Sequence, residues 1–275
     1  MPPGTIIRTC RGCGLSVRTP LPLARDAAAA YDAEYYREYQ MVGRKAPPTL
    51  MAALPLLEPA VGPGRLLEIG CGLGSFLAQA RERGWNVQGV EVSPWAATQA
   101  KQASSVPVLI SRAEALPFHT GTFDAVVSHH VFEHLPDPFQ ALRESRRVCR
   151  TGGRLLLVLP NELQHLFLRS ALQARHGLRA GDGLVANLRR WLAYQTAKPP
   201  RDSSHIFFFH PRVLRQAAEQ TGWHPLRLTT FRTQRDTVSG YALGGLLKTS
   251  LYALEVWMRR GPEMALLAEA REAVS

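Results

Sequence analysis

From residue 65 onward, short apolar runs alternate with longer amphipathic stretches. Short apolar runs bounded by turn residues predict buried strands, and apolar positions at helical spacing predict helices. We expect strands at residues 65–69, 85–90, 107–110, 124–128, 154–159, 225–231 and 263–268. Helices are expected at residues 75–83, 93–101 and 213–221, and after Pro138. Strands that alternate with helices are typical of a doubly wound, mostly parallel α/β sheet.

Departures from this alternation divide the chain into four parts. Residues 1–59 precede the sheet and hold a Cys-x-x-Cys knuckle and two expected helices, at 27–40 and 47–57. Residues 60–160 form the first part of the sheet, and residues 161–210 a helical insertion. Residues 211–275 complete the sheet around a second insertion at 238–260, whose apolar positions recur at helical spacing. This spacing predicts core packing or a homodimer face rather than contact with a membrane.

The charge of the chain bears on its partners. The formal net charge is +11, but the basic residues are scattered rather than clustered. Arg143, Arg146, Arg147 and Arg150 fall within one expected helix, where they predict a solvated face. We therefore expect no nucleic acid, and an anionic or nucleotide-linked small molecule is the sharper hypothesis. No membrane span or signal peptide is expected, and four unevenly spaced cysteines favour the cytoplasm.

Residues 68–74, Glu-Ile-Gly-Cys-Gly-Leu-Gly, join the first expected strand to its helix. Gly70, Gly72 and Gly74 allow a tight turn that a ligand can approach closely, beside the positive end of a helix. The dinucleotide fingerprint G-x-G-x-x-G is not met. Glu91 ends the second strand, where doubly wound nucleotide sites place the carboxylate that binds the ribose. The alternatives are a turn without a ligand and a solvated glutamate.

Four motifs occur in one order along the chain: the glycine-rich turn, residues 112–118 (Arg-Ala-Glu-Ala-Leu-Pro-Phe), residues 123–127 (Phe-Asp-Ala-Val-Val) and residues 133–138 (Glu-His-Leu-Pro-Asp-Pro). Together they resemble the small-molecule branch of the class I S-adenosylmethionine-dependent methyltransferases. The resemblance implies a seven-stranded Rossmann-like fold with an antiparallel last strand. It implies S-adenosylmethionine as cofactor and S-adenosylhomocysteine as product. The implied cofactor contacts are Glu68, Gly70, Cys71, Gly72, Gly74, Glu91, Val92, Ala113, Glu114 and His129.

Two features near the expected cofactor qualify this resemblance. The family has an acid that accepts the adenine amino group where this chain has Arg112, and an arginine cannot accept a hydrogen bond. Glu114 or a backbone carbonyl would have to take its place. The helix at 27–40 carries Tyr31, Tyr35 and Tyr36, and in the family an aromatic N-terminal helix closes over the cofactor. Ordinary core packing is the alternative.

Histidines gather where the acceptor of the methyl group is expected. His129 and His130 end the central strand, His134 follows within a turn, and His205 follows the insertion. Imidazole titrates near neutral pH, so His130, His134 and His205 are the candidate bases, with His130 first. In extended chain His129 and His130 would point to opposite sides, His129 toward the cofactor. The alternative is that these residues are structural.

The N-terminal knuckle holds Cys10 and Cys13. It resembles the second half of the zinc ribbon that precedes some sugar-modifying methyltransferases, but the first half is missing. A structural zinc ion needs four ligands. We expect zinc to be absent or substoichiometric in the monomer, and no metal elsewhere. Completion of the site by histidines or by a partner chain is the alternative.

The resulting hypothesis is methyl transfer to a small-molecule, sugar, glycolipid or natural-product acceptor, with O-methylation first. Three alternatives remain open. These are an RNA methyltransferase, a nucleotide-dependent oxidoreductase and a non-catalytic module that only binds the cofactor.

Overall fold

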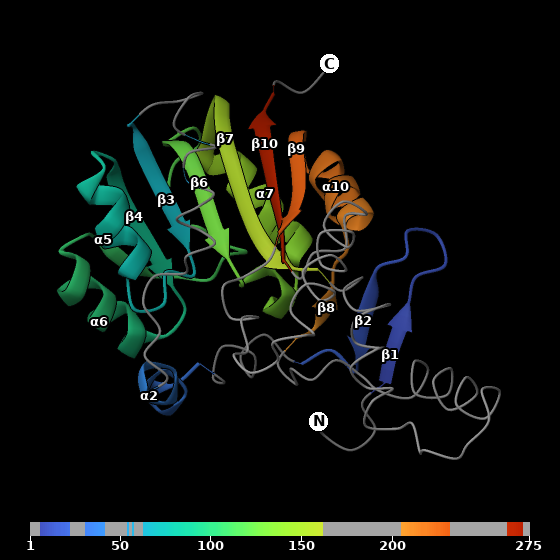
Figure 1. Ribbon diagram of the computed structural model, residues 1–275, viewed down its shortest axis with the longest axis horizontal. Helices are drawn as coiled ribbons and strands as arrows, with labels where there is room; N and C mark the ends of the chain where they lie inside the picture. The colour runs from blue at the N-terminus through green and yellow to red at the C-terminus, as the bar shows by residue number, and fades with distance from the viewer. Residues whose placement is uncertain are drawn as a thin grey trace, which may run out of the picture.

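A computed structural model describes residues 6–22, 31–41, 54, 57, 63–161, 205–231 and 263–271. Its centre is a seven-stranded sheet in the order β5-β4-β3-β6-β7-β10-β9 (Figure 1). The first five strands in this order run parallel to one another. Strand β10 is antiparallel to both β7 and β9. The expected doubly wound sheet, with the last strand inserted antiparallel, is confirmed.

The elements of this sheet and its helices follow the predicted order. The strands are β3 (Arg65–Ile69), β4 (Asn86–Glu91), β5 (Val108–Ile110), β6 (Phe123–His129), β7 (Cys149–Pro160), β9 (Trp223–Phe231) and β10 (Glu263–Ala270). The helices are α5 (Ser75–Glu82), α6 (Pro94–Ser104), the 3-10 turn η2 (Phe132–His134), α7 (Pro138–Val148) and α10 (Pro211–Gln220). Asp137 caps α7 by accepting a hydrogen bond from the Gln140 N–H at 2.8 Å, and Pro138 takes its first position, as expected.

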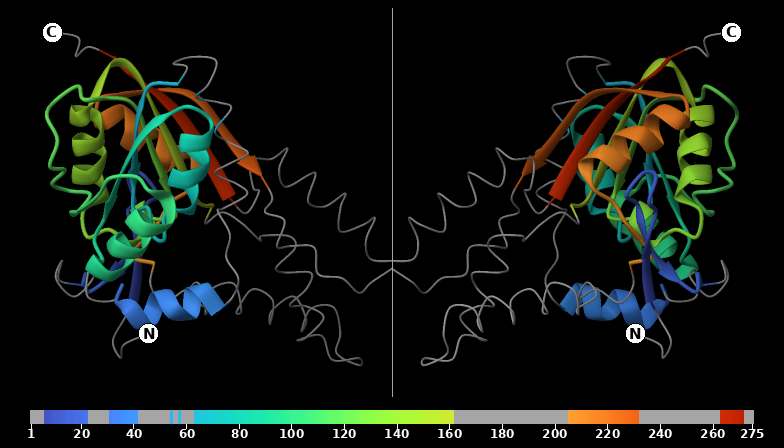
Figure 2. Two further views of the ribbon diagram at one scale, coloured as in Figure 1. Left: turned by 90° about the vertical axis from the view of Figure 1, so that its left-hand side faces the viewer. Right: turned by 90° about the vertical axis from the view of Figure 1, so that its right-hand side faces the viewer.

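Side chains of the central strands alternate between two cores. Val126 and Leu155 pack on the side that α7 and α10 cover, while Val127 and Leu156 pack on the side of α5 and α6. Figure 2 shows α7 and α10 together on one side of the sheet. Because both faces are buried, the strands read as continuous apolar runs.

A second, smaller sheet was not predicted. β1 (Ile6–Thr9) and β2 (Ser16–Thr19) form an antiparallel hairpin around the knuckle, and β2 also pairs with β8 (Phe207–Phe208). This sheet and α2 (Ala33–Met41) lie at the end of the main sheet toward which its parallel strands point (Figure 1, Figure 2). The N-terminal region therefore lies at the edge where ligands of such sheets bind.

Several predictions fall outside the described residues. These are most of the helix at 47–57, most of the insertion at 161–210, and the insertion at 238–260 with its dimer face. The predicted four-part division of the chain stays a prediction. Within the described part of the chain, no helix is long and apolar enough to cross a membrane.

Candidate functional site

The glycine-rich turn has a backbone that requires glycine. Gly70, Gly72 and Gly74 have φ angles of 71°, 53° and 77°. A Cβ on Gly70 would lie 2.3 Å from Val131 Cγ2, and one on Gly74 would lie 2.9 Å from the Cα of Ala100. The turn is thus packed closely from both sides, and it leads directly into the N-terminus of α5. Such a turn leaves backbone N–H groups available to a ligand.

Glu91 holds this turn from the end of β4. Its side chain is buried and accepts hydrogen bonds from the Gly72 N–H at 2.9 Å and the Ser93 N–H at 3.0 Å. Burial raises the pKa of Glu91, although these N–H groups and Tyr36 oppose the shift. A carboxylate at this strand end, beside the glycines, fits the predicted contact with ribose hydroxyls.

Glu68 and Cys71 lie behind the turn rather than on its surface. Glu68 is buried, and its Oε2 has no hydrogen-bond partner. Burial, and then the charge of Glu91, hold the pKa of Glu68 well above its usual range. Burial likewise raises the pKa of the Cys71 thiol. Burial thus disfavours the charged form of both side chains, which lie close to Glu91.

The helix α2 covers this half of the site. Tyr36 is buried, its ring stacks on Trp95 with centroids 6.2 Å apart, and its Cε1 lies 3.7 Å from where a Gly72 Cβ would be. The Tyr36 hydroxyl also bonds to Glu91, and burial followed by the Glu91 charge raises the pKa of Tyr36. Tyr31 reaches in the other direction, with its ring centroid 6.0 Å from that of His134. The helix and the residue Tyr31 before it thus cover the glycine turn and the histidines together, as a lid would.

The segment after β5, predicted to contact adenine, is fixed by α7. Glu144 accepts from the Leu116 N–H at 2.9 Å, and Arg147 donates to the carbonyls of Leu116 and Phe118 at 2.9 and 2.6 Å. Ala113 is buried, and the exposed Arg112 pairs with Glu114 at 3.3 Å. Glu114, the predicted substitute acceptor for adenine, is therefore already paired.

The arginines near α7 are not the solvated face that the sequence predicted. Arg147 holds the segment after β5, and Arg150, which lies in β7, pairs with Asp124 at 2.6 Å. Arg146 bonds to backbone carbonyls from three other parts of the chain. Among the described residues, Arg143 is the one arginine of this group whose side chain bonds only within its own helix. The basic residues of this helix mostly serve the fold.

His129 and His130 lie on the same side of the chain, which corrects the predicted opposite orientation. Their ring centroids are 4.2 Å apart. The reason is the backbone of His130, whose φ of 53° ends the extended strand and turns its side chain back. The imidazoles predicted to separate cofactor from acceptor are therefore neighbours.

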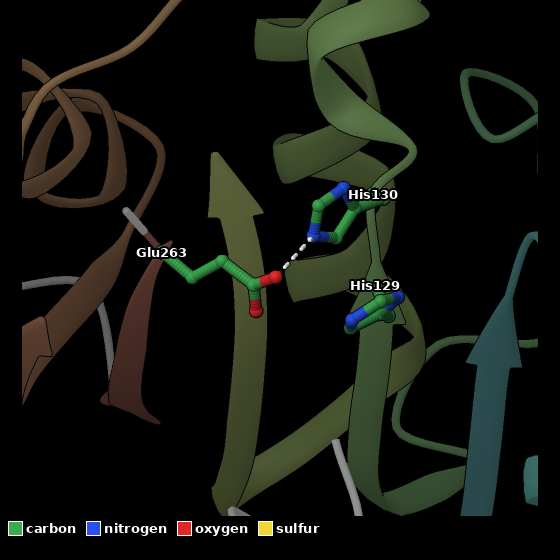
Figure 3. Close-up of side chains that lie close together, drawn as sticks. All are labelled: His129, His130 and Glu263. Carbon is green, nitrogen blue, oxygen red and sulfur yellow. Dashed lines mark ion pairs between the residues drawn. The ribbon is translucent and has the colours of Figure 1, made fainter. Parts of the chain in front are cut away.

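Two buried carboxylates join these histidines: Glu133, which lies in the 133–138 motif at the expected place of the chemistry, and Glu263, which the sequence did not mark. Glu133 Oε1 lies 3.5 Å from His130 Nδ1 and 3.6 Å from His134 Nε2. Glu263, the first residue of β10, places Oε1 3.5 Å from His130 Nε2 (Figure 3). Burial opposes a charge on His130, but Glu263 and Glu133 outweigh it, so the pKa of His130 is raised. Spacing could not reveal Glu263, because a long stretch of chain separates it from the histidines.

His205 completes the group from the far side of the insertion. It is buried, and its ring centroid lies 4.9 Å from that of His134. The Ile206 N–H donates to the Glu133 carbonyl at 2.8 Å, which fixes the segment of His205 against η2. All four predicted histidines thus gather at the carboxyl edge of β6.

Val92, another predicted cofactor contact, is half-buried beside Glu91.

The knuckle lies apart from this group. Cys10 is exposed and Cys13 half-buried, and hydrogen bonds from Cys13 and Gly12 lower the pKa of Cys10. Within the described part of the chain, no third histidine, cysteine or acid lies close enough to complete a metal site with them. The expectation that zinc is absent there stays a prediction.

Several of the known proteins with similar sequences or folds carry methyltransferase names. Residues 67–157 match a family described as a methyltransferase domain. The chain is 30% identical over 124 residues to a ubiquinone biosynthesis O-methyltransferase of Pseudomonas aeruginosa, covering 42% of this chain and 52% of that protein. The first curated relatives are matched over 30% to 52% of their own length.

Two solved structures share the fold at low identity. A possible histamine N-methyltransferase from Thermotoga maritima has a TM-score of 0.57 at 20% identity, with 86% of this chain and 96% of that chain covered. A Haemonchus contortus phosphoethanolamine N-methyltransferase in complex with S-adenosyl-L-methionine has a TM-score of 0.53 at 17% identity, with 82% and 54% covered.

The sheet order and the glycine turn define a Rossmann-like methyltransferase fold. Residues 67–157 match a methyltransferase domain, and the sheet order is that of the Rossmann-like methyltransferase fold, which agrees with the class I resemblance of the motifs.

Proposed function

We propose that the protein transfers a methyl group from S-adenosylmethionine to a small-molecule acceptor held at the carboxyl edge of β6. The observation that carries this proposal is the buried Glu91 carboxylate, which anchors the glycine turn through Gly72 at 2.9 Å. Such a carboxylate can bind two ribose hydroxyls, while the turn offers N–H groups to the amino-acid part of the cofactor. The methyltransferase match favours this cofactor over the nicotinamide of an oxidoreductase.

The chemistry asked of the chain is alignment, exclusion of water and removal of a proton. The acceptor attacks the methyl carbon, the carbon–sulfur bond breaks, and the sulfur keeps the electron pair, which leaves S-adenosylhomocysteine. A hydroxyl acceptor also loses its proton to a base within hydrogen-bond reach. His130, His134 and His205 are the candidates, gathered beside η2. We propose O-methylation first, because a hydroxyl needs the base that this group offers.

The cofactor half is tested by binding of S-adenosylhomocysteine. We expect a micromolar dissociation constant, equivalent to about 7–8 kcal/mol. Glu91→Ala should lose about 2–4 kcal/mol of this, since charge-assisted hydrogen bonds to the ribose disappear. Glu91→Gln, which keeps one acceptor oxygen, should lose less. Isothermal calorimetry measures both, with the exposed Glu82→Ala as control.

An unchanged dissociation constant in Glu91→Ala would remove the ribose role of this residue. Binding of NADH without binding of S-adenosylhomocysteine would instead overturn the cofactor and return the oxidoreductase to first place.

The acceptor half is tested by formation of S-adenosylhomocysteine over a panel of phenols, sugars and nucleotide-linked sugars. His130→Ala should keep cofactor affinity within about twofold and lower turnover about 10²–10⁴-fold, the usual effect of losing a general base. If turnover falls only in His205→Ala, the proton acceptor lies beside the insertion. If every single histidine variant stays active, alignment alone carries the transfer and the acceptor needs no deprotonation.

A further inference from the structure

We propose that His129, His130 and Glu263 bind a divalent transition-metal ion, with zinc as the first to test, at the carboxyl edge of the main sheet. One ligand atom from each of the three residues lies within 4.8 Å of the others. Figure 3 shows Glu263 reaching across from the start of β10 toward the two imidazoles at the end of β6. Two imidazoles and a carboxylate are the donor set of many zinc and other transition-metal sites.

The spacing of the donor atoms suits one ion. His130 Nε2 and Glu263 Oε1 are 3.5 Å apart, which is long for a hydrogen bond. Two ligands bound tetrahedrally at about 2.1 Å lie about 3.4 Å from each other. The observed gap is therefore the edge that an ion between these atoms would require.

His130 is also oriented as metal-binding histidines are. Its Nδ1 faces Glu133 Oε1 at 3.5 Å, while its Nε2 faces Glu263. A histidine that binds a metal through one nitrogen usually gives the N–H of the other to a carboxylate, which fixes the ring. Glu133 lies on the Nδ1 side of the ring, where such a carboxylate would be, and Nε2 faces Glu263 on the opposite side.

The charges of this group are poorly compensated by hydrogen bonds. Both carboxylate oxygens of Glu133, Oε2 of Glu263 and Nε2 of His130 are buried without a hydrogen-bond partner. Glu133 is 1% exposed and Glu263 8% exposed. Among the described residues, neither carboxylate pairs with a lysine or an arginine. Buried carboxylates without hydrogen bonds are costly, and a divalent cation beside them offsets that cost.

The backbone gives independent support. His130 has a φ of 53°, a left-handed conformation that a non-glycine residue seldom adopts. Strain of this kind persists where a functional geometry depends on it. Here it brings His130 beside His129, and an extended strand end would separate them.

A second group, Glu133 with His134 and His205, also has its donor atoms close together. We favour the first because two of its three residues, His129 and His130, are only half-buried. His205 and Glu133 are both buried. Glu133 then serves the metal site by orienting His130.

The site deepens the proposed function and, in this respect, rests on it. A metal ion beside the acceptor would bind its hydroxyl oxygen and lower the pKa of that hydroxyl. His130 would then be a ligand and not the base, and His134 or His205 would receive the proton. Loss of turnover in His130→Ala fits both roles, whereas loss of metal binding fits only the ligand role.

Zinc binding to the chelator-treated full chain tests the proposal without an acceptor. The knuckle thiols are removed first by Cys10→Ser and Cys13→Ser, so that any remaining zinc is held elsewhere. We expect one zinc per chain by dialysis and metal analysis. Glu263→Gln and His129→Ala should each weaken the affinity at least about 100-fold by calorimetry. His119→Ala, which removes an exposed histidine that precedes β6, at the opposite end of that strand from these ligands, should leave it unchanged.

Binding of S-adenosylhomocysteine separates this proposal from the previous one, and circular dichroism reports that each variant is folded. If a ligand variant fails to fold, cobalt(II) bound to the thiol-free parent should show an absorption spectrum of nitrogen and oxygen ligands. The proposal is overturned if the thiol-free chain binds no zinc, or binds it undiminished in Glu263→Gln. It is also overturned if His205→Ala alone abolishes binding. Zinc binding without cofactor binding would overturn the proposed function and leave the metal site standing.

Discussion

Glu68 and Glu91 lie on neighbouring strands, and their burial links the charge of the site to its stability. Glu68 pairs in register with Gly89, two residues before Glu91. Its pKa is held well above the usual range by burial and then by Glu91. The folded chain therefore keeps the proton of Glu68 to a higher pH than the unfolded chain does. In the unfolded chain a glutamate loses its proton at about pH 4.3. Stability depends on pH wherever the two states bind different numbers of protons.

From this difference we predict the effect of Glu68→Gln. Since the folded chain binds more protons, the wild-type free energy of unfolding falls as pH rises from the unfolded pKa to the folded pKa. A glutamine resembles the neutral acid and does not titrate, so this part of the fall should disappear. Urea unfolding from pH 4 to 8 should show the variant gaining stability relative to wild type as pH rises. Glu82→Gln, at an exposed site, should run parallel to wild type. A parallel curve for Glu68→Gln would mean that Glu68 is ionised in the fold.

Residue by residue, the sequence located the candidate site only where spacing reveals it. Glu91 and the glycines follow one another across a single strand–helix–strand unit, so their proximity could be inferred. Glu263 and His130 meet because β10 inserts between β7 and β9, and the sequence holds no local sign of that contact. Tyr36 was predicted to be part of a lid, but its bond to Glu91 depends on the position of α2.

Among the elements, α5 and α6 touch through a glycine. Gly74 has a φ of 77°, and a Cβ there would lie 2.9 Å from both the Cα and the carbonyl oxygen of Ala100 in α6. Gly121 has a similar φ of 70°, but the nearest atom to its Cβ would be 3.9 Å away. The two positions therefore share backbone strain and differ in available space.

We predict that Gly74→Ala destabilises the fold more than Gly121→Ala does. The left-handed conformation should cost each variant about 1–2 kcal/mol. Displacement of α6 should add about 1–3 kcal/mol to Gly74→Ala alone. Chemical denaturation measures the difference, and Gly74→Ala should also weaken S-adenosylhomocysteine binding. Equal losses in the two variants would show that α5 and α6 separate without cost.

Elements were predictable where their apolar pattern is strong. The strands and helices of the main sheet appear within a few residues of their expected bounds, since both faces of the sheet are buried. The small sheet was missed because β1, β2 and β8 hold four, four and two residues. The β1 and β2 residues are exposed or half-buried, so they leave no apolar run. The third strand of this sheet, β8, pairs with β2 from beyond the insertion.

Across the whole molecule, the topology divides the site in two. The glycine turn and Glu91 lie at the ends of β3 and β4, whereas the histidines lie at the end of β6 and Glu263 at the start of β10, on the two sides of β7. The helix α2 contacts the first half through Tyr36, and Tyr31, two residues before the helix, contacts the second. The order of the sheet could be predicted from the motifs. The meeting of these two halves under α2 could not, because it depends on long-range packing.

Far from the site, Arg146 joins distant parts of the chain. From α7 it donates to the carbonyls of Gly222 at 3.1 Å, Cys149 at 3.4 Å, and Arg271. These carbonyls belong to the turn before β9, the start of β7 and the residue after β10. One side chain thus fixes one end of the three strands that complete the sheet.

We predict that Arg146→Ala lowers the free energy of unfolding by about 1–3 kcal/mol, since carbonyls lose charged donors. Arg143→Ala is the matched control, because Arg143 is exposed on the same helix and bonds only to Gln140 among described partners; it should change stability by less than about 0.5 kcal/mol. Arg146→Lys should fall between them, since an ammonium group cannot span three carbonyls. Urea denaturation ranks the three variants.

Hydrogen exchange locates the effect within the sheet. The amides of β9 and β10 should exchange faster in Arg146→Ala than in wild type, whereas the amides of β3 and β4 should still exchange only through global unfolding. If Arg146→Ala is as stable as Arg143→Ala, these strands are held by the apolar packing of α10 alone.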